Sequence, residues 1–159
     1  MEIKYIKGDA TEPIVIDDKY SVICHCCNAL GAWGKGFVVP LGKKYPIARE
    51  KYLEFIENTP KENRLGSVSF AKVNDNIIVA NIIGQYYTYP KEGKIPLDYE
   101  ALEKGFKFII NIFKMHKMPL TIHMPKIGCG LAGGDWNVVE KIIKNTFIKE
   151  EIEVYVYLL

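Results

Sequence analysis

Two short apolar stretches, residues 20–27 and 77–83, constrain the fold more than any other feature of the sequence. A strand that is buried on both faces has a continuous apolar sequence, because neither set of alternating side chains meets water. Further strands are predicted at residues 2–6, 67–73, 120–124 and 152–158, and helices at residues 48–57, at 137–147 and from an N-cap at Asp98 to about residue 115. Strands that alternate with helices predict an α/β fold with a mostly parallel sheet and helices on both faces.

Length and composition indicate one folded domain. The 159 residues suit a single domain spanning residues 1–159, and no linker or internal repeat divides them. With 48% hydrophobic and 25% charged residues, the composition is that of a globular protein and excludes a disordered chain. No apolar run approaches the ~20 residues that span a bilayer. The first residues also lack the apolar block of a signal peptide, so we expect no membrane partner and a cytoplasmic location.

Charge and cysteine content argue against two further kinds of site. The 21 basic and 19 acidic residues give a net charge of +2, which is too balanced for general nucleic-acid binding. Three of the four cysteines, Cys24, Cys26 and Cys27, lie in one predicted strand, where successive side chains face opposite sides of the sheet. The sequence contains no Cys-x-x-Cys pair. We therefore predict small buried thiols and no metal site.

Two glycine-rich loops follow two of the predicted strands, at residues 28–36 and 128–135, and together hold seven of the 13 glycines. Glycine lets successive backbone amides approach an anion and form a concave nest for phosphate oxygens. Each loop also leads toward a helix, whose N-terminus favours negative charge. Neither loop matches Gly-x-x-x-x-Gly-Lys-Ser/Thr or Gly-x-Gly-x-x-Gly. The loops therefore indicate a phosphate-bearing ligand, with tight turns alone as the alternative.

Three motifs resemble the macro domain family. They are Gly8-Asp9-Ala10-Thr11, His25-Cys26-Cys27-Asn28 followed by Gly31-Ala32-Trp33-Gly34-Lys35-Gly36-Phe37, and Met124-Pro125-Lys126-Ile127-Gly128-Cys129-Gly130-Leu131. They are most similar to the branch that holds ADP-ribose 1''-phosphate phosphatases and the terminal ADP-ribose protein glycohydrolase. The resemblance implies a three-layer α/β/α fold with a mixed, mostly parallel sheet of about six strands. It also implies ADP-ribose or a derivative as ligand and no cofactor.

The resemblance assigns ligand contacts residue by residue. Asp9 would accept a hydrogen bond from the adenine amino group, with the Ala10 amide near the ring, and Asn28 would reach the distal ribose. The backbone of Gly34, Lys35 and Gly36 would wrap that ribose and its phosphate, and Ile127, Gly128, Cys129, Gly130 and Leu131 would hold the diphosphate. Trp33 and Trp136 would wall the pocket. The alternatives are a turn residue for Asp9, a strand-end turn residue for Asn28, and plain packing for either tryptophan.

The resemblance does not assign every catalytic residue. The glycohydrolase branch depends on a lysine where this chain has Gln85, and on an aspartate where Ala132 stands, with Asp135 three residues further on. Hydrolysis of a 1''-phosphate is then the preferred reaction, with Asp135 activating a water and His25 donating a proton. The alternatives are an N-cap for Asp135 and a core histidine for His25. His123 is interpreted as structural.

Three functions are consistent with these residues. They are a hydrolase acting on an ADP-ribose derivative, a non-catalytic ADP-ribose reader, and a domain that binds another nucleotide or an RNA end. ADP-ribosylated protein or nucleic acid is the candidate macromolecular partner. Tyr86, Tyr87, Tyr89 and Tyr99 cluster around two prolines and predict a lid or rim over the pocket, or a loop packed by its own aromatic rings.

Overall fold

The computed structural model describes residues 1–159 and contains one six-stranded sheet with the order β1-β6-β5-β2-β4-β3. The strands are β1 (Lys4–Lys7), β2 (Tyr20–Asn28), β3 (Val68–Lys72), β4 (Ile77–Gln85), β5 (Leu120–Met124) and β6 (Val154–Leu158). All neighbours run parallel except β3 and β4, which are antiparallel. This confirms the predicted α/β fold with a mixed, mostly parallel sheet.

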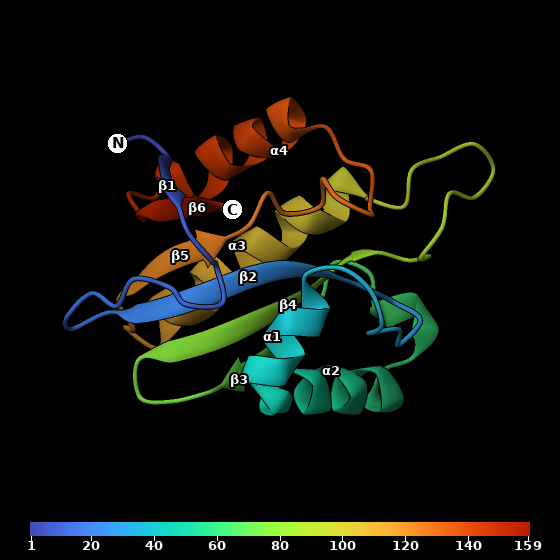
Figure 1. The fold of residues 1–159 in the computed structure, drawn as a ribbon, viewed down its shortest axis with the longest axis horizontal. Helices are drawn as coiled ribbons and strands as arrows, with labels where there is room; N and C mark the ends of the chain where they lie inside the picture. Colours follow the sequence, from blue (N-terminus) through green and yellow to red (C-terminus); the bar gives the residue numbers. More distant parts are fainter.

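Helices cover both faces of the sheet and complete the three layers (Figure 1). The helices α1 (Val38–Lys44) and α2 (Pro46–Asn58) lie on one side, and α3 (Tyr99–Met115) and α4 (Trp136–Ile143) lie on the other. A 3-10 turn, η1 (Lys61–Asn63), follows α2, and a π-helical turn, η2 (Lys144–Ile148), follows α4. No helix is both long enough and apolar enough to cross a membrane.

The strands β2 and β4, each of which lies between two neighbouring strands, account for the continuous apolar runs of the sequence. In β2, Ile23 packs in the cluster with Leu41 of α1 and Ala48 of α2. Its neighbours Val22 and Cys24 instead belong to the large cluster that contains the α3 and α4 side chains. Because alternate side chains enter the two cores, neither face of these strands is polar.

The predicted helices are confirmed with small differences. The Asp98 side chain caps α3 by accepting from the Ala101 amide at 3.0 Å, as predicted. The predicted helix at residues 137–147 is α4 together with η2. Helix α1 was not predicted, because Pro40 and Gly42 lower the helix propensity of this short segment.

Candidate ligand-binding site

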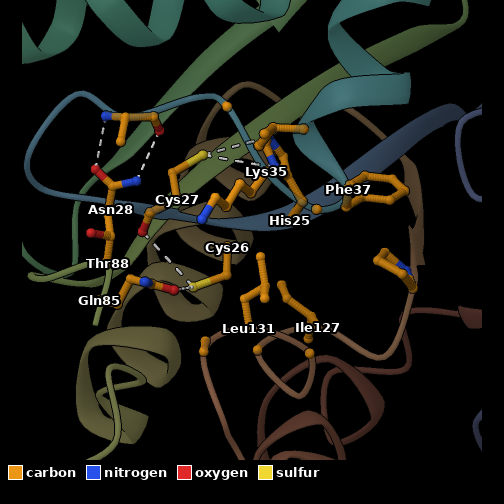
Figure 2. Close-up of a pocket in the computed structure, with 18 of the residues that line it drawn as sticks. His25, Cys26, Cys27, Asn28, Lys35, Phe37, Gln85, Thr88, Ile127 and Leu131 are labelled. Carbon is orange, nitrogen blue, oxygen red and sulfur yellow. Dashed lines mark hydrogen bonds between the residues drawn. The ribbon is translucent and has the colours of Figure 1, made fainter. Parts of the chain in front are cut away.

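A cavity of about 680 Å³ lies between the two glycine loops, beyond the carboxyl ends of β2 and β5. Nine predicted site residues line it: His25, Asn28, Gly34, Lys35, Gly36, Ile127, Gly128, Gly130 and Leu131. Figure 2 shows Phe37 toward one end, Asn28, Gln85 and Thr88 toward the other, and Ile127 and Leu131 along one side. In a parallel sheet this edge is where ligands bind, because the loops after neighbouring strands part there.

The first loop turns tightly around its own asparagine. Gly31 and Gly36 have φ angles of 85° and 81°, which favour glycine. The Asn28 Oδ1 accepts from the amides of Leu30 and Ala32, each at 3.0 Å, and its Nδ2 donates to the Ala32 carbonyl at 2.8 Å. The strand-end turn that was the alternative for Asn28 is therefore present. Asn28 also lines the cavity, so its predicted ribose contact stays a prediction.

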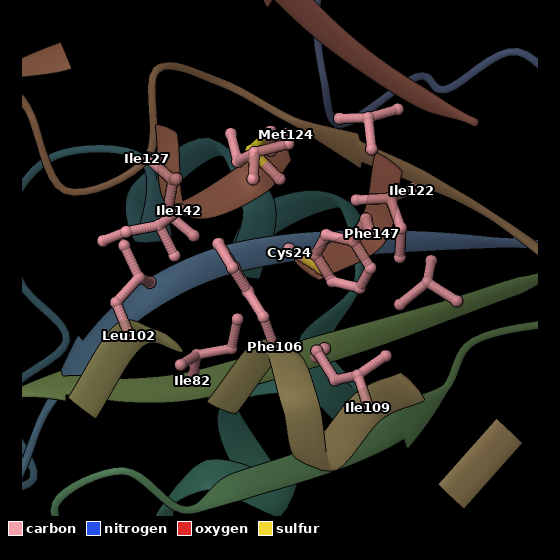
Figure 3. Close-up of a cluster of buried hydrophobic side chains, with 14 of the residues drawn as sticks. Cys24, Ile82, Leu102, Phe106, Ile109, Ile122, Met124, Ile127, Ile142 and Phe147 are labelled. Carbon is pink, nitrogen blue, oxygen red and sulfur yellow. The ribbon is translucent and has the colours of Figure 1, made fainter. Parts of the chain in front are cut away.

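The second loop is a compact backbone turn anchored in the core. Gly128 and Gly133 both have φ angles of 74°, and the Gly134 amide donates to the Gly128 carbonyl at 2.8 Å. Ile127 is 2% exposed and belongs to the large core cluster under α3 and α4 (Figure 3). A Cβ placed on Gly36 would lie 3.4 Å from the Leu131 Cδ1, so the two loops meet across the cavity.

Both loops offer backbone amides without a partner in the protein. On the first loop these amides belong to Gly34, Lys35 and Gly36, and on the second to Gly128, Gly130 and Leu131. All six residues line the cavity. Successive unpaired amides of this kind can donate to the oxygens of a phosphate. The geometry thus provides two donor-rich turns that face one space.

The charges of the cavity are positive. None of the lining residues is an aspartate or glutamate, whereas Lys35 and Lys126 carry ammonium groups. Burial raises the pKa of the Cys26 thiol to about 12 and that of Cys27 well above its ordinary value, so both thiols are neutral. An anionic ligand therefore meets two positive side chains and no negative one.

His25 is a buried, neutral histidine. Its side chain is 1% exposed, and its Nε2 lies 2.5 Å from the Asn81 Oδ1. Because the Asn81 Nδ2 donates to the Ala48 carbonyl at 3.0 Å, the Asn81 oxygen must accept from His25, which places the proton on Nε2. Burial lowers the pKa of His25 to about 4. This geometry is that of a core histidine, which was the alternative for His25. The role of His25 as a proton donor stays a prediction.

Asp135 caps α4 and does not line the cavity. Its Oδ1 accepts from the Asn137 amide at 2.9 Å, and the residue is exposed. Gln85, at the position of the family lysine, does line the cavity. Its Nε2 donates to the Tyr87 carbonyl at 2.8 Å, and its Oε1 lies 3.7 Å from the Cys26 Sγ. The N-cap alternative thus holds for Asp135, which does not by itself exclude a catalytic role.

Neither predicted tryptophan is among the residues that line the cavity. Trp33 packs behind the first loop, with ring centroids 5.4 Å from Tyr52 and 5.6 Å from His25. Trp136 packs against Tyr5 and donates its Nε1 proton to the Tyr5 hydroxyl at 2.9 Å. Plain packing accounts for both rings. The aromatic side chain that does line the cavity is Phe37, which the sequence analysis included in a motif but gave no role.

The predicted adenine contacts lie beyond the Phe37 end of the cavity. Asp9 is exposed, and its Oδ1 accepts from both the amide and the hydroxyl of Thr11 at 2.8 Å. Ala10 is buried beside Tyr155 and Tyr157 in a cluster against which Phe37 packs. Neither Asp9 nor Ala10 lines the cavity, so their contacts with adenine stay predictions. Cys129 is also absent from the lining, although both of its neighbours are present.

The tyrosine-rich segment forms a projecting loop (Figure 1). A second cavity, of about 660 Å³, is lined by residues of this loop. The rings of Tyr86 and Tyr87 lie 4.8 Å apart, and those of Tyr87 and Tyr89 lie 5.6 Å apart. The Tyr99 hydroxyl accepts from the Asp135 amide at 2.9 Å. From this segment only Thr88 lines the ligand cavity. The aromatic rings of the loop pack on one another, as the alternative describes, and a role as lid or rim of the cavity stays a prediction.

Sequence reasoning gave no role to two residues that hold the first loop from behind. The Tyr52 hydroxyl contacts the loop backbone, and the Arg64 Nη1 donates to the Ala29 carbonyl at 3.0 Å. Tyr52 falls within the predicted helix at residues 48–57, and Arg64 falls outside every predicted helix and strand. No local sequence signal distinguishes a tyrosine that packs from one that also bonds to a distant loop.

Comparison with known proteins places these features in a family. No family model matches the chain. It is 26% identical over 158 residues to the ADP-ribose 1''-phosphate phosphatase of Candida albicans, covering 97% of this chain and 99% of that one. A solved protein of unknown function from Bacteroides thetaiotaomicron is 44% identical with a TM-score of 0.89, covering 100% and 99% of the two chains. The macrodomain protein of Streptomyces coelicolor is 34% identical with a TM-score of 0.81, covering 99% of each chain. With that identity over the whole length, the same layered sheet and the three motifs at its edge, the chain belongs to the macro domain family.

Proposed function

We propose that the chain binds ADP-ribose or a derivative of it in the cavity between the two glycine loops, and hydrolyses the 1''-phosphate of such a derivative. The observation that carries the binding proposal is the set of unpaired loop amides around a cavity without a negative charge. A diphosphate needs donors and positive potential on two sides. The similarity to the Candida albicans phosphatase supports the same ligand.

The positions of the lining residues suggest how the ligand lies. Phe37 and the adjoining Asp9-Ala10 segment mark one end, where the adenine would contact an aromatic ring and a carboxylate acceptor. The amides of both loops, Lys35 and Lys126 surround the middle, which suits the diphosphate. Asn28, Gln85 and Thr88 form the opposite end, which suits the polar hydroxyls of the distal ribose.

Calorimetric titration with ADP-ribose, ADP and AMP tests the binding proposal. A site built for the whole ligand should bind ADP-ribose more tightly than ADP, because only ADP-ribose fills the Asn28 end. Raising the salt concentration should weaken binding, since Lys35 and Lys126 attract the diphosphate through screened charges. Equal affinity for ADP-ribose and ADP would contradict the proposed orientation.

Hydrolysis is proposed with the roles predicted for Asp135 and His25. Asp135 would deprotonate a water that attacks the phosphorus, and His25 would protonate the leaving ribose oxygen. Each role requires a change from the geometry described, because Asp135 bonds to the Asn137 amide and His25 to Asn81. The neutral His25 must also take up a second proton from solvent before it can donate one. Phosphate release from ADP-ribose 1''-phosphate by wild type, His25→Ala and Asp135→Ala is the measurement. Unchanged turnover in both variants rejects the two roles.

A non-catalytic reader is the second candidate, favoured by the absence of any carboxylate from the cavity lining and by an amide at Gln85. A carboxamide is neither a nucleophile of the lysine kind nor a base. The partner would then be an ADP-ribosylated protein or nucleic acid. Tight binding of ADP-ribose without turnover of ADP-ribosylated substrates or the 1''-phosphate would select this function. The proposed compartment is the cytoplasm, where the four free cysteines would stay reduced.

A further inference from the structure

A single buried hydroxyl behind the first loop joins the two ends of its turn. Tyr52 of α2 is completely buried, and its hydroxyl donates to the Asn28 carbonyl at 2.6 Å. The same oxygen accepts from the Gly31 amide at 3.1 Å. Gly31 is the residue whose φ of 85° reverses the chain. The Tyr52 hydroxyl therefore bridges the start of the turn and its reversal point.

This bridge bears on which atoms Asn28 presents to the cavity. The Asn28 Oδ1 already accepts from the Leu30 and Ala32 amides and lies 3.0 Å from the Tyr52 hydroxyl. One proton of its Nδ2 goes to the Ala32 carbonyl. A carboxamide has two N–H donors, so one remains unused. Asn28 can therefore offer the cavity a donor but no free acceptor.

A second side chain supports the same turn from the residue that follows η1. The Arg64 guanidinium donates to the Ala29 carbonyl at 3.0 Å, and also to the carbonyls of Ile56 and Thr59, each at 2.8 Å. The consecutive Asn28 and Ala29 carbonyls thus each have a side-chain donor, one from α2 and one from the residue after η1. The backbone of the turn is held before any ligand arrives.

We propose that Tyr52 is a positioning residue for the distal-ribose end of the cavity, because it fixes the turn in which Asn28 offers an N–H to a ribose or phosphate oxygen. Tyr52 does not line the cavity and acts through Asn28. The consequence is a preference for ADP-ribose over ADP, since ADP lacks the group that this donor would meet. The inference rests on the proposed binding of ADP-ribose.

The variant Tyr52→Phe isolates the hydroxyl. It keeps the ring that packs against Trp33 and removes only the oxygen that bridges Asn28 and Gly31. We expect the affinity for ADP-ribose to fall about tenfold, the equivalent of roughly one lost hydrogen bond to the loop. The affinities for ADP and AMP should stay within about twofold, because those ligands do not reach Asn28.

Ser69→Ala is the matched control. The Ser69 hydroxyl is also buried and donates to a backbone carbonyl of α2, that of Lys51, at 3.0 Å. It does not contact the first loop. Its loss should lower the melting temperature in the same way as the loss of the Tyr52 hydroxyl, while the ratio of ADP-ribose to ADP affinity stays at the wild-type value.

The outcomes separate this inference from the proposed function. A wild-type protein without preference for ADP-ribose over ADP contradicts the proposed function itself. A wild-type preference that Tyr52→Phe leaves unchanged, or an equal loss for both ligands, overturns the positioning role. Amide hydrogen exchange of the wild type gives a test that needs no variant. The Gly31 amide should be protected relative to that of Gly34, which has no partner, and equal exchange would also overturn the inference.

Discussion

The first glycine loop is held by its own Asn28 and by side chains that reach it from outside, whereas the second is held mainly by its own backbone. Tyr52 and Arg64 bond to the backbone of the first loop. In the second loop, the Gly134 amide bonds to the Gly128 carbonyl and the Gly133 amide to the Gly130 carbonyl. Two glycine-rich loops that both present unpaired amides to the cavity thus depend on different interactions.

This difference teaches where each loop is sensitive. Removing polar atoms that lie outside the cavity should destabilise the first loop, because those atoms hold its turn. Adding a side chain at a glycine should destabilise the second loop, because its backbone segments are in contact at positions where glycine leaves room. The predictions below test the contrast, in order of their expected effect on the free energy of unfolding.

Gly134→Ala should have the largest effect. A Cβ at this position would lie 2.6 Å from the Gly128 carbonyl oxygen and 2.4 Å from the Leu97 Cδ2. The leucine can move, but the carbonyl belongs to the turn itself, so we expect a loss of about 3 kcal/mol. Gly130→Ala is the control, since nothing lies within 4 Å of its added methyl group, and it should change stability by less than about 0.5 kcal/mol. Urea unfolding measures both, and equal stabilities would show that the second turn is not tightly packed.

Protonation of a single buried histidine by acid should have the next largest effect. Burial lowers the pKa of His25, which packs under the first loop, and of His123 to about 4, against an ordinary value of 6.5. Between these values the unfolded chain binds more protons than the folded one, so stability falls as the pH drops from about 6.5 toward 4. At pH 5 the loss is about 2 kcal/mol for each histidine relative to pH 7.

The variants His25→Gln and His123→Gln divide this pH dependence between the two sites. Glutamine keeps an N–H donor but does not titrate, so either variant should remove about half of the slope between pH 7 and pH 5. His25 contacts the rings of Trp33 and Phe37, so its replacement should also reduce ADP-ribose affinity. His123 bonds to Thr121 and Tyr157, and its replacement should not affect the first loop. A full wild-type slope in His25→Gln would contradict its lowered pKa.

Arg64→Met should cost about 1–2 kcal/mol, because three backbone carbonyls lose a donor. One of them is the Ala29 carbonyl of the first loop, so the affinity for ADP-ribose should fall as well. Arg49→Met is the control, since Arg49 lies exposed on α2 and forms no hydrogen bond or ion pair. Thermal unfolding and ADP-ribose titration of the two variants should differ in both quantities. Identical behaviour would remove Arg64 from the support of the loop.

The sequence allowed the sheet to be predicted better than the supports of the site. Burial on both faces leaves a continuous apolar pattern, so β2 and β4 could be located within two residues of their observed ends. The glycine loops were visible for a similar reason, since positive φ angles select glycine. No local sequence pattern predicts the direction in which Trp33 packs, because that direction depends on α2 lying behind the loop.

The support of the first loop shows the same limit more sharply. Tyr52 lies 24 positions from Asn28 along the chain, and Arg64 lies 35 positions from Ala29. Their hydrogen bonds exist only because α2 returns to the end of β2 in the folded chain. A tyrosine on an apolar helix face and an isolated arginine have many possible partners, and the sequence alone does not select among them.

Asp135→Ala should have the smallest effect on stability and decides whether the cap at the exit of the second loop is also catalytic. Its Oδ1 accepts from the Asn137 amide, and loss of such a cap costs about 1 kcal/mol. Asp98→Ala removes the equivalent cap of α3 and should cost a similar amount. If Asp135 activates the attacking water, phosphate release from ADP-ribose 1''-phosphate falls about 100-fold in Asp135→Ala alone. If both variants turn over like the wild type, the Asp135 side chain serves only as the N-cap of α4, and the second loop keeps no side chain that holds it as Tyr52 holds the first.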